Sequence, residues 1–366
     1  CQHKSMNTTC INFDFTQRMK DIHSIDLIKN YKLIPLETRD SVIIGKIDKA
    51  ILYKDQIYIA TFHRDQAVYI FNLQGKFLHK INTIGRGPEE YLQLSDIFID
   101  ENNQTLNLLS RIDAKLLTYD INNLNIIKSS PLPKAFYKMI SLKDRYLGHS
   151  GNYTQDKDEP YNLWDMDLDF RIINKAIVID PRWESKMANI RPLSTYQDTI
   201  FYITPTDFNI YQYDGKKVSI SHSVNFGKYQ LPSEQISYDE YKKYCLSPYY
   251  ITAIRIFQET PNYYLYWVVE SGQDRLCVYN KKNQESIAIR LVYSQNSENR
   301  ESRNYKCMAF SGFSLPNCDL CPSPMIKYSF FKNHRFLRRL LIPSEDSFNF
   351  YPSIALLSYP PKTGGY

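Results

Sequence analysis

Asp65-Gln-Ala-Val-Tyr-Ile-Phe-Asn72 is the stretch of this chain that decides its fold, because its eight-residue pattern occurs six times. The pattern is Asp or Gln, two variable residues, an apolar residue, two further variable residues, an aromatic residue, and Asn or Asp. The copies cover 65–72, 113–120, 158–165, 207–214 and 273–280, with a weaker copy at 353–360, and successive copies start 48, 45, 49, 66 and 80 residues apart. A period in the forties with short strands between turn residues is typical of a β-propeller, in which each repeat forms one blade.

The repeated segment is apolar on both faces of an extended chain. In the first copy, Val68 and Ile70 point to one side, and Tyr69 and Phe71 point to the other. A strand of this kind must be covered on both faces, as a blade strand is when it lies between two neighbouring blades. The leading Asp is suited to a tight turn, since its carboxylate accepts backbone N–H groups two residues on. The closing Asn or Asp is expected to open the next hairpin turn.

The composition is that of a globular chain rich in strands. Hydrophobic residues make up 43% of the 366 residues and aromatic residues 14%, including 30 Tyr, a residue type that favours strands. Twelve Gly and 18 Pro are too few for a fibrous or disordered chain. Six copies of the pattern in order also argue against chance spacing of Asp and Asn in a Tyr-rich protein. We therefore predict an all-β fold, a six-bladed β-propeller with four-stranded blades.

The charge pattern gives no indication of a nucleic-acid or membrane-spanning protein. The formal net charge is +6, and basic residues form no run beyond the short stretch Arg335–Arg339. We therefore expect no nucleic-acid partner. No apolar run approaches the ~20 residues that span a bilayer. We also expect no cofactor and no bound metal.

The first residues resemble the start of a mature bacterial lipoprotein, because Cys1-Gln2 is followed by polar residues up to Thr9. In such proteins a signal peptide is removed and the new N-terminal Cys carries lipid, and several acyl chains anchor the protein without a transmembrane helix. The alternative is an arbitrary chain boundary that happens to fall on Cys. We expect lipid attachment at Cys1, a tether and lead-in at residues 1–30, and one propeller domain at residues 31–366. The expected location is the bacterial cell envelope, on the periplasmic or surface side of the outer membrane.

The remaining cysteines do not define a metal centre. Cys277 lies in a repeated segment and is expected to be a small buried hydrophobic residue. Cys318-Asp-Leu-Cys321, with Cys307 nearby, has the spacing of a zinc or redox motif, but no second Cys pair or His cluster completes four ligands. A local disulfide, or free thiols, is therefore favoured over a metal site.

Two gaps at the ends of the chain predict how the propeller closes. Tyr31–Glu37 has the pattern of a strand that precedes the first full repeat, while the copy at 353–360 has no partner strand after it. Pairing of Tyr31–Glu37 with Ile354–Tyr359 completes a sixth blade and removes two open edges. The five preceding blades are expected near residues 46–82, 96–129, 139–179, 191–226 and 251–292.

Two long inserts separate blades in the second half of the chain, and they fall at Gly227–Tyr250 and Tyr293–Ser323. The first has spacing compatible with a helix, and Pro232-Ser233 is a candidate helix start. Each insert joins the last strand of one blade to the first strand of the next. Long loops on a rigid scaffold are where binding residues tend to lie.

The link Gly85-Arg-Gly-Pro-Glu-Glu-Tyr91 joins the first two blades. Its two glycines permit a turn and Pro88 stiffens it. No Lys-Ser or Lys-Thr follows, so the link is not a phosphate-binding loop. In one interpretation it is a rigid connector in which Glu90 bonds backbone amides. In the other, Arg86 and Glu89 face a central ligand.

Three motifs give the chain a family resemblance. They are the link at 85–91, the segment Leu36-Glu37 followed by Ile44-Gly-Lys-Ile47, and Phe226-Gly-Lys-Tyr229 after the fourth blade. With them the chain resembles the six-bladed β-propeller lipoproteins of gut Bacteroidetes, which are similar in architecture to NHL-repeat propellers. The resemblance runs from Tyr31 onward, and the chain departs from it in the Cys-containing insert and at Pro352. It implies the fold but no activity, because most members have none assigned.

Loops that open the repeated segments and the links between blades are expected to share one face. Arginines beside aromatic residues on such a face suit carboxylates, phosphates or sugar rings. An ordinary solvated face is the alternative. The candidate ligand-binding residues are Arg64, Arg86, Glu89, Tyr91, Arg111, Asn152, Lys228 and Tyr229, and His63, His149, Arg182 and Trp183 are expected nearby.

Signatures of catalysis are sparse. Only His63 and His149 occupy equivalent blade positions, too few for a three-histidine zinc site. Glu89, Asn152 and Glu270 are conceivable calcium ligands, but their spacing does not select them. No nucleophile elbow, HExxH motif or paired carboxylate motif occurs.

These observations favour a non-catalytic lipoprotein that binds a ligand or a protein. The partner is expected to be a glycan, an acidic peptide or an envelope protein, the membrane is reached through the lipid anchor only, and the chain is expected to be a monomer. A metal-dependent hydrolase or lyase acting at the central channel is the first alternative. A structural scaffold of the envelope is the second.

Lipid attachment predicts the effect of one substitution. In the native precursor, Cys1→Ser should release the protein from membranes, because the acyl chains lose their attachment atom. Membrane fractionation of cells that express each form measures this. A protein that fractionates as soluble before and after the change contradicts the lipoprotein interpretation.

Overall fold

The computed structural model describes most of the chain between residues 9 and 292 and four short strands beyond it. The described residues are 9–13, 20–23, 32–63, 65–154, 156–186, 191–204, 207–232, 236–245, 247, 249–270, 273–292, 307–310, 325–328, 339–342 and 357–358. The chain divides into two compact units, each of which is considered by itself. Unit 1 contains Cys1–Ile22 and Arg145–Val292, and unit 2 contains His23–Asp144 and Tyr293–Tyr366.

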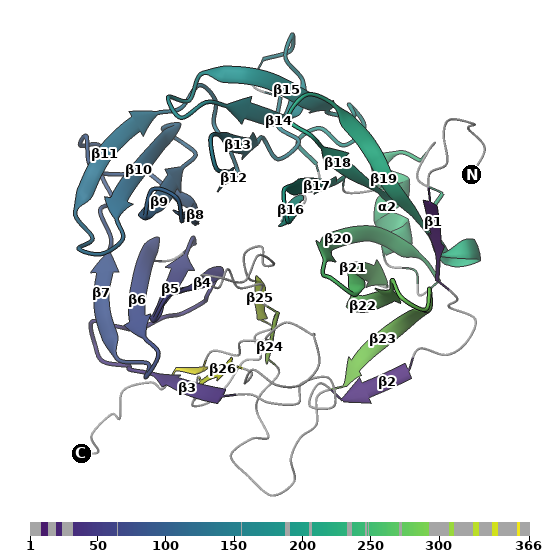
Figure 1. Ribbon diagram of the computed structural model, residues 1–366, viewed down its shortest axis with the longest axis horizontal. Coiled ribbons are helices and arrows are strands. Elements are labelled where there is room, and N and C mark those ends of the chain that lie inside the picture. The colour runs from purple at the N-terminus through teal and green to yellow at the C-terminus, as the bar shows by residue number, and fades with distance from the viewer. Residues whose placement is uncertain are drawn as a thin grey trace, which may run out of the picture. The chain divides into compact units, whose positions relative to one another are not determined.

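Unit 2 contains two complete four-stranded antiparallel sheets and starts a third (Figure 1). The first sheet has the order β4-β5-β6-β7, and the second has the order β11-β10-β9-β8. Their strands are β4 (Lys49–Tyr53), β5 (Gln56–Thr61), β6 (Ala67–Asn72), β7 (Phe77–Ile81), β8 (Leu94–Asp100), β9 (Thr105–Ser110), β10 (Lys115–Asp120) and β11 (Ile126–Pro131). The third sheet begins with β12 (Lys138–Ser141).

Unit 1 holds the rest of the third sheet and two further sheets. The third sheet has the order β12-β13-β14-β15, and in the next two the strands β16 to β19 and β20 to β23 also lie in sequence order. The strands are β13 (Tyr146–His149), β14 (Tyr161–Met166), β15 (Ile172–Val178), β16 (Leu193–Tyr196), β17 (Thr199–Ile203), β18 (Asn209–Tyr213), β19 (Val218–Asn225), β20 (Ile251–Glu259), β21 (Tyr263–Glu270), β22 (Gln273–Asn280) and β23 (Ser286–Val292).

The repeated eight-residue pattern forms the third strand of each of these five sheets. These third strands are β6, β10, β14, β18 and β22. One repeat therefore corresponds to one four-stranded sheet, as predicted, and the described chain has an all-β propeller fold with four-stranded blades.

The described residues form five such blades, and the predicted count of six is not confirmed. Most of the sixth copy lies outside the described residues. Closure of the ring by Tyr31–Glu37 is not confirmed either. β3 (Lys32–Leu36) lies between β26 (Arg339–Ile342) and β27 (Leu357–Ser358) in a three-stranded sheet, and β27 is part of the predicted partner segment Ile354–Tyr359. The pairing of β3 with β27 is parallel and covers two residues, fewer than a typical strand contains.

Unit 2 also contains a pair of short strands, in which β24 (Cys307–Phe310) pairs with β25 (Met325–Tyr328).

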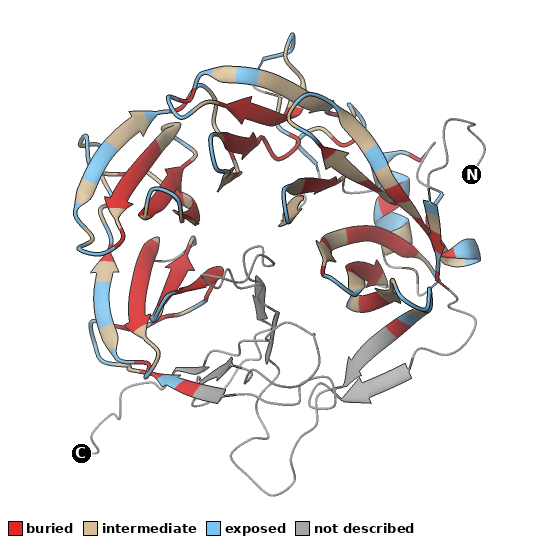
Figure 2. Ribbon diagram, in the orientation of Figure 1, coloured by how far each residue is buried: buried red, intermediate tan, exposed pale blue. Residues whose placement is uncertain are grey.

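Burial of the repeated strand on both faces is confirmed in the first blade. Val68, Tyr69, Ile70 and Phe71 are all buried (Figure 2). Tyr69 and Phe71 belong to one hydrophobic cluster, which includes residues of β3 and β5. Val68 and Ile70 belong to a second cluster, which includes residues of β8, β9 and β10. Each face of β6 therefore packs against a different layer.

The Asn or Asp that closes the pattern builds the next hairpin turn. Asn72 Oδ1 accepts hydrogen bonds from the backbone N–H groups of Gln74 (3.0 Å) and Lys76 (2.9 Å). The equivalent oxygens of three other copies also accept from the amide two residues on, namely Asp120, Asp214 and Asn280. This is the side-chain turn expected from the sequence.

The insert between the fourth and fifth blades contains a helix, as predicted, but the helix starts later than Pro232-Ser233. It is α2 (Tyr238–Cys245). Ser237 and Glu240 form a reciprocal cap, in which Glu240 Oε2 accepts from the Ser237 backbone N–H (2.8 Å) and Ser237 Oγ accepts from the Glu240 N–H (3.3 Å). The S-x-x-E capping box sets the helix start here.

Residues within the predicted tether form two additional strands. β1 (Thr9–Asn12) pairs in parallel with β19, and β2 (Lys20–His23) adds to β23. The ring of Phe13, which follows β1, lies 5.5 Å from that of Phe226 and 5.7 Å from that of Tyr266. These contacts cover the outer edge of the fourth blade, where backbone groups of an edge strand otherwise lack partners.

Of the cysteine predictions, the one for Cys277 is confirmed, because its side chain is fully buried and burial raises the pKa of its thiol. Cys1, Cys318 and Cys321 lie outside the described residues. Within the described part of the chain, no helix is both long and apolar enough to cross a membrane.

The packing of the fourth blade against the fifth contains a buried histidine. The His222 ring on β19 is 2% exposed and stacks on the Tyr264 ring with centroids 4.7 Å apart. Its Nε2 lies 2.7 Å from the Tyr266 hydroxyl oxygen, and its Nδ1 lies 3.1 Å from Ser221 Oγ. Burial, and secondarily the charge of Lys281, lowers the pKa of His222 to about 4.

This pKa predicts a loss of stability in mild acid. Between pH 6.5 and 4 the unfolded chain binds a proton at His222 that the folded chain does not. Stability is therefore complete above pH ~6.5 and decreases by about 3 kcal/mol as the pH falls to ~4. His222→Phe should remove most of this slope, as measured by denaturant unfolding across the pH range. His79→Phe, at an exposed position of β7, should leave the slope unchanged, and an unchanged slope in His222→Phe contradicts the assignment.

Candidate functional site

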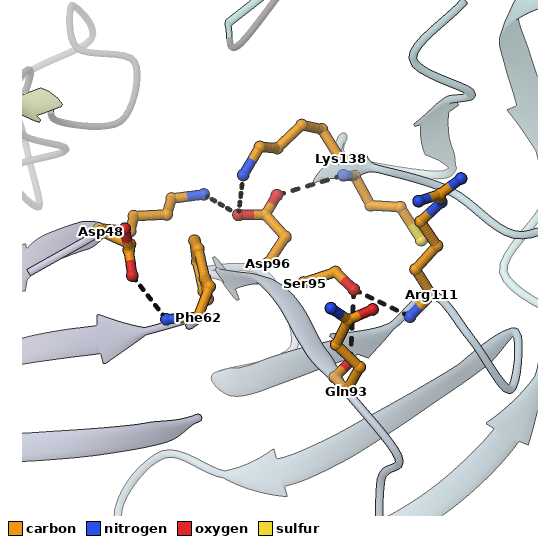
Figure 3. Close-up of polar contacts among 9 residues, drawn as sticks. Asp48, Phe62, Gln93, Ser95, Asp96, Arg111 and Lys138 are labelled. Carbon is orange, nitrogen blue, oxygen red and sulfur yellow. Dashed lines mark hydrogen bonds and ion pairs between the residues drawn. The ribbon is translucent and has the colours of Figure 1, made fainter. Parts of the chain in front are cut away.

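The first strands of three successive blades bring three charged residues together in unit 2. Lys49 opens β4, Asp96 is the third residue of β8, and Lys138 opens β12. Asp96 Oδ1 accepts hydrogen bonds from Lys49 Nζ (2.9 Å) and from Lys138 Nζ (3.2 Å), as Figure 3 shows. A single carboxylate thus connects these three first strands, all of which belong to unit 2.

Burial makes this contact strong. The side chain of Asp96 is 1% exposed, that of Lys49 is 11% exposed and that of Lys138 is 24% exposed. Burial alone raises the pKa of Asp96, but the two ammonium groups outweigh it, and the net effect lowers the pKa below its ordinary value. The stabilisation is therefore present above pH ~4 and is lost as the pH falls further, through the lowered pKa.

The three residues carry one positive charge in excess, because two ammonium groups share one carboxylate. Each ammonium group has three N–H donors, and the hydrogen bond to Asp96 uses one of those of Lys138. The Nζ atom of Lys138 also lies 5.0 Å from the centroid of the Phe62 ring. Lys138 therefore places a partly exposed cation beside an aromatic ring.

A second acidic residue anchors the loop that carries Phe62. Asp48 Oδ2 accepts from the Phe62 backbone N–H (2.7 Å; Figure 3). Asp48 Oδ1 lies 2.5 Å from Lys46 Nζ. The side chain of Lys46 is 44% exposed. His63 is also exposed, and its Nε2 lies 3.7 Å from Asp48 Oδ1. This loop opens the first repeated segment and is one of those that the sequence analysis placed on the candidate face.

Arg111, one of the predicted ligand-binding residues, lies beside these groups. Its guanidinium carbon lies 3.7 Å from the centroid of the Tyr137 ring, and its backbone N–H donates to Ser95 Oγ (3.0 Å; Figure 3). Ser95 precedes Asp96 and Tyr137 precedes Lys138, so Arg111 is joined to the three charged residues through two of their chain neighbours. Lys46, Lys49, Arg111 and Lys138, with Asp48 and Asp96, are called the cationic cluster below.

All members of the cationic cluster lie at the same end of their strands. Lys49 and Lys138 start β4 and β12, Asp96 lies near the start of β8, and Arg111 follows the end of β9, which is antiparallel to β8. Antiparallel pairing brings the end of one strand to the start of the next. Within unit 2, the loops that open the repeated segments and the links between blades therefore meet at this end of the strands. The sequence predicted that these loops and links share one face.

The link at 85–91 has the connector structure predicted in one of its two interpretations. Glu90 Oε2 accepts from the Gly87 backbone N–H (2.7 Å). A Cβ atom added to Gly85 would lie 1.9 Å from this carboxylate oxygen, which explains why the position holds glycine. Lys115 Nζ donates to the carbonyl oxygens of Gly87 (3.2 Å) and Glu90 (2.9 Å).

The other predicted residues of unit 2 differ in exposure. Arg86 and Glu89 are exposed on the link. Tyr91 is fully buried in a hydrophobic cluster, and its hydroxyl donates to the Gln66 carbonyl oxygen (2.5 Å), so its ring serves packing. Arg64 lies outside the described residues. Ligand binding by Arg86, Glu89 and Arg111 stays a prediction.

Three predicted residues belong to unit 1. Asn152 is buried with a φ of 59°, and its Oδ1 accepts from Asn162 Nδ2 (2.5 Å) within a loop network. Lys228 and Tyr229 are in the short 3-10 helix Gly227–Tyr229, where Lys228 Nζ lies 5.3 Å from the Tyr229 ring centroid. Lys228 is exposed, whereas Asn152 shapes the loop that contains it.

Residues considered as metal ligands have other contacts. Glu270 Oε2 accepts from Arg275 Nε (2.9 Å), and His149 is buried with its ring 5.8 Å from that of Tyr202. Among the residues that the structure describes, no three His, Cys, Asp or Glu side chains are grouped so that they could hold a metal ion.

Sequence reasoning did not single out Lys49, Asp96 or Lys138, although a signal was present. In three successive blades a charged residue stands at or near the start of the first strand, in KAILY, LSDIFID and KMIS. Charged residues in buried strands are rare unless they are paired. Residues of opposite charge at equivalent positions of neighbouring blades could therefore have indicated the contact of Lys49 and Lys138 with Asp96.

Comparison with known protein families identifies the family to which the chain belongs. Residues 8–304 match the family described as Domain of unknown function (DUF4934), so the chain belongs to this family. No curated protein matches it. The resemblance to NHL-like propeller lipoproteins is confirmed only as far as the propeller fold.

Solved structures agree with the fold. The chain is similar to a candidate exported protein from Bacteroides fragilis NCTC 9343, with a TM-score of 0.65 and 21% identity over 76% of this chain and 80% of that one. A member of the DUF4221 family from Bacteroides vulgatus has a TM-score of 0.47 and 10% identity over 70% and 86% of the two chains. PorZ, a surface component of the type-IX secretion system of Porphyromonas gingivalis, has a TM-score of 0.40 and 10% identity over 70% and 29%. The first likeness shows the fold alone, and the weaker two carry no argument.

The contact of Asp96 with two lysines predicts a large effect on stability. Asp96→Asn keeps the shape of the side chain but leaves two largely buried ammonium groups without their counter-ion. Unfolding free energy should fall by about 3 kcal/mol. Asp169→Asn is the matched control, because Asp169 is 70% exposed in its ion pair with Arg171, and exposed pairs contribute about 1 kcal/mol or less. Equal effects of the two substitutions, measured by urea unfolding at pH 7, contradict this account.

Proposed function

We propose that this chain is a non-catalytic binding propeller of the bacterial cell envelope and that its cationic cluster binds an anionic ligand. The observation that carries the proposal is the sharing of buried Asp96 by Lys49 and Lys138, which leaves an excess of positive charge at the loop end of the blades. Arg111 adds a further cation at the same end, where Lys46 also lies, paired with Asp48.

The cluster has the properties of a prepared anion site. The ion pairs and the aromatic rings of Phe62 and Tyr137 hold the cations in place before a ligand arrives. Fixed charges lose little conformational entropy on binding, so more of the electrostatic attraction remains as affinity. Partial burial of Lys138 also reduces screening by solvent.

Location in the envelope is supported by similarity to the candidate exported protein of Bacteroides fragilis. An envelope protein of this kind meets glycans, acidic peptides and other envelope proteins. Acidic members of these classes fit the cluster, and the binding unit is a monomer.

A binding experiment tests the proposal. The purified chain should bind at least one of two polyanions, polygalacturonate or polyphosphate, and should not bind neutral dextran. Affinity should fall as salt is raised from about 50 to about 300 mM, because screening weakens contacts between exposed charges.

A double variant assigns the binding to the cluster. Lys46→Gln with Lys138→Gln should weaken binding by at least about tenfold. Lys157→Gln with Lys216→Gln, at exposed positions of unit 1, changes the net charge equally and should not weaken it. Absence of polyanion binding, or equal binding by the two variants, overturns the proposal.

A further inference from the structure

Residues 9–13 lie on the outer edge of the fourth blade as an extended peptide lies on the edge of a sheet. Strand β1 pairs in parallel with the last four residues of β19, starting with Thr9 opposite His222 (Figure 1). The backbone N–H of Phe13 continues the pairing, because it donates to the Asn225 carbonyl oxygen (2.9 Å). Addition of a strand to the edge of a sheet is a recurring way in which proteins bind peptides.

Two side chains at alternate positions anchor this segment. Ile11 is 2% exposed and Phe13 is 4% exposed, whereas Asn12 between them is exposed. The Phe13 ring stacks on that of Phe226, which follows β19, and meets the edge of the Tyr266 ring on β21. The anchors therefore lie among aromatic side chains of the fourth and fifth blades, and both blades belong to unit 1.

The residue between the anchors makes polar contacts with the same two blades. Asn12 Oδ1 accepts a hydrogen bond from Asn225 Nδ2 (2.8 Å), at the end of β19. The Asn12 carbonyl oxygen accepts from Ser286 Oγ (2.7 Å), at the start of β23. Three successive positions are thus recognised, in the order aliphatic, amide, aromatic.

The fourth blade has its four strands without this segment. β19 pairs with β18 on its other side, and among the described residues the first three blades have four strands and no fifth. Two buried anchors are set against the conformational entropy that the segment gains when it leaves. Occupation of the edge by residues 9–13 is therefore expected to be reversible.

Part of the edge is left for a longer segment. β1 pairs with four of the eight residues of β19, and Ile220, in the other half, is 42% exposed. A longer partner segment can pair along more of β19 and cover Ile220. A second copy of this chain brings only the same segment, without the advantage of being linked to the blade.

From these contacts we infer that the outer edge of β19 is a docking site for an extended segment of a protein partner, in which an aliphatic, an amide and an aromatic residue follow one another. Residues 9–13 are the chain's own occupant of this site, and the partner segment replaces them. The inference goes beyond the proposed function, because the site contains no residue of the cationic cluster.

A peptide added to the full chain tests the inference. Ile11→Ser with Phe13→Ser removes both anchors, and this variant should bind a fluorescent peptide of residues 7–15 that carries Ser in place of Cys10. The native chain should bind it at least about tenfold more weakly, because its own segment is present at a high effective concentration. The peptide with both anchors replaced by Ser should not bind. Fluorescence anisotropy measures binding, and thermal melting shows whether the variant is folded.

One further substitution assigns the binding to the edge. In the variant without anchors, Asn225→Asp keeps the acceptor for the Gly227 N–H but removes the donor to Asn12, and it should weaken peptide binding about fivefold. Asn122→Asp, at an exposed position of unit 2, changes the charge equally and should have no effect.

Hydrogen exchange of the native chain tests the inference without any substitution. The Phe13 amide should exchange at least about a hundredfold faster than the Val224 amide, which donates to the Phe208 carbonyl oxygen (2.8 Å), because the segment leaves while the blade stays folded. Equal protection of the two amides makes the segment an integral part of the blade and overturns the inference, even where the variant without anchors does not fold.

The remaining outcomes are also decisive. A folded variant that does not bind the peptide, or binding that Asn225→Asp leaves unchanged, overturns the docking site. A dimer of the native chain that the anchor substitutions abolish, seen by light scattering, assigns the edge to a second copy and overturns the partner protein. Polyanion binding should be the same with and without the anchors, so failure of the anion site and failure of this site are distinguishable.

Discussion

The hydrogen bonds from Lys49 and Lys138 to Asp96 are the interaction on which the candidate site depends. A buried carboxylate is tolerated only when cations and hydrogen bonds compensate its lost hydration. In this chain the compensation comes from two neighbouring blades, so the first strands of three blades are held in one arrangement. The same arrangement fixes the positions of the cations that we propose to bind ligands. Stability and binding thus use the same groups, and a substitution at Asp96 affects both.

A second constraint is the strand that is buried on both faces, as β6 is in the first blade. In β6, Tyr69 and Phe71 pack into one cluster, while Val68 and Ile70 pack into another. No single blade can bury such a strand alone, and the fold therefore needs repeated blades. The turns that follow these strands are fixed locally by Asn or Asp side chains. The local turns and the non-local packing thus favour the same fold, which is a property of chains that fold to one structure.

Features set by near neighbours in the chain could be predicted. The third strands, the side-chain turns and the role of Glu90 all depend on residues within a few positions of each other. Burial of Cys277 followed from its place in a repeated strand. The helix in the first insert was predicted, but its start was misplaced because the Ser237–Glu240 capping box had not been considered. The added strands β1 and β2 were not predicted, because their partner strands lie more than 200 residues further along the chain.

The sequence by itself determined that this chain repeats, that each repeat supplies a strand apolar on both faces, and that the repeats form propeller blades. It also indicated the end of the strands at which loops and links meet. Only the tertiary structure decided which charged residues share that end. Lys49, Asp96 and Lys138 are separated by 47 and 42 residues, and their contact depends on the packing of first strands from successive blades. Tertiary structure likewise showed that Tyr91 serves packing whereas Arg111 is held against Tyr137. The physical reason is that hydrophobic periodicity is local to each strand, whereas charge pairing depends on distances that only packing sets.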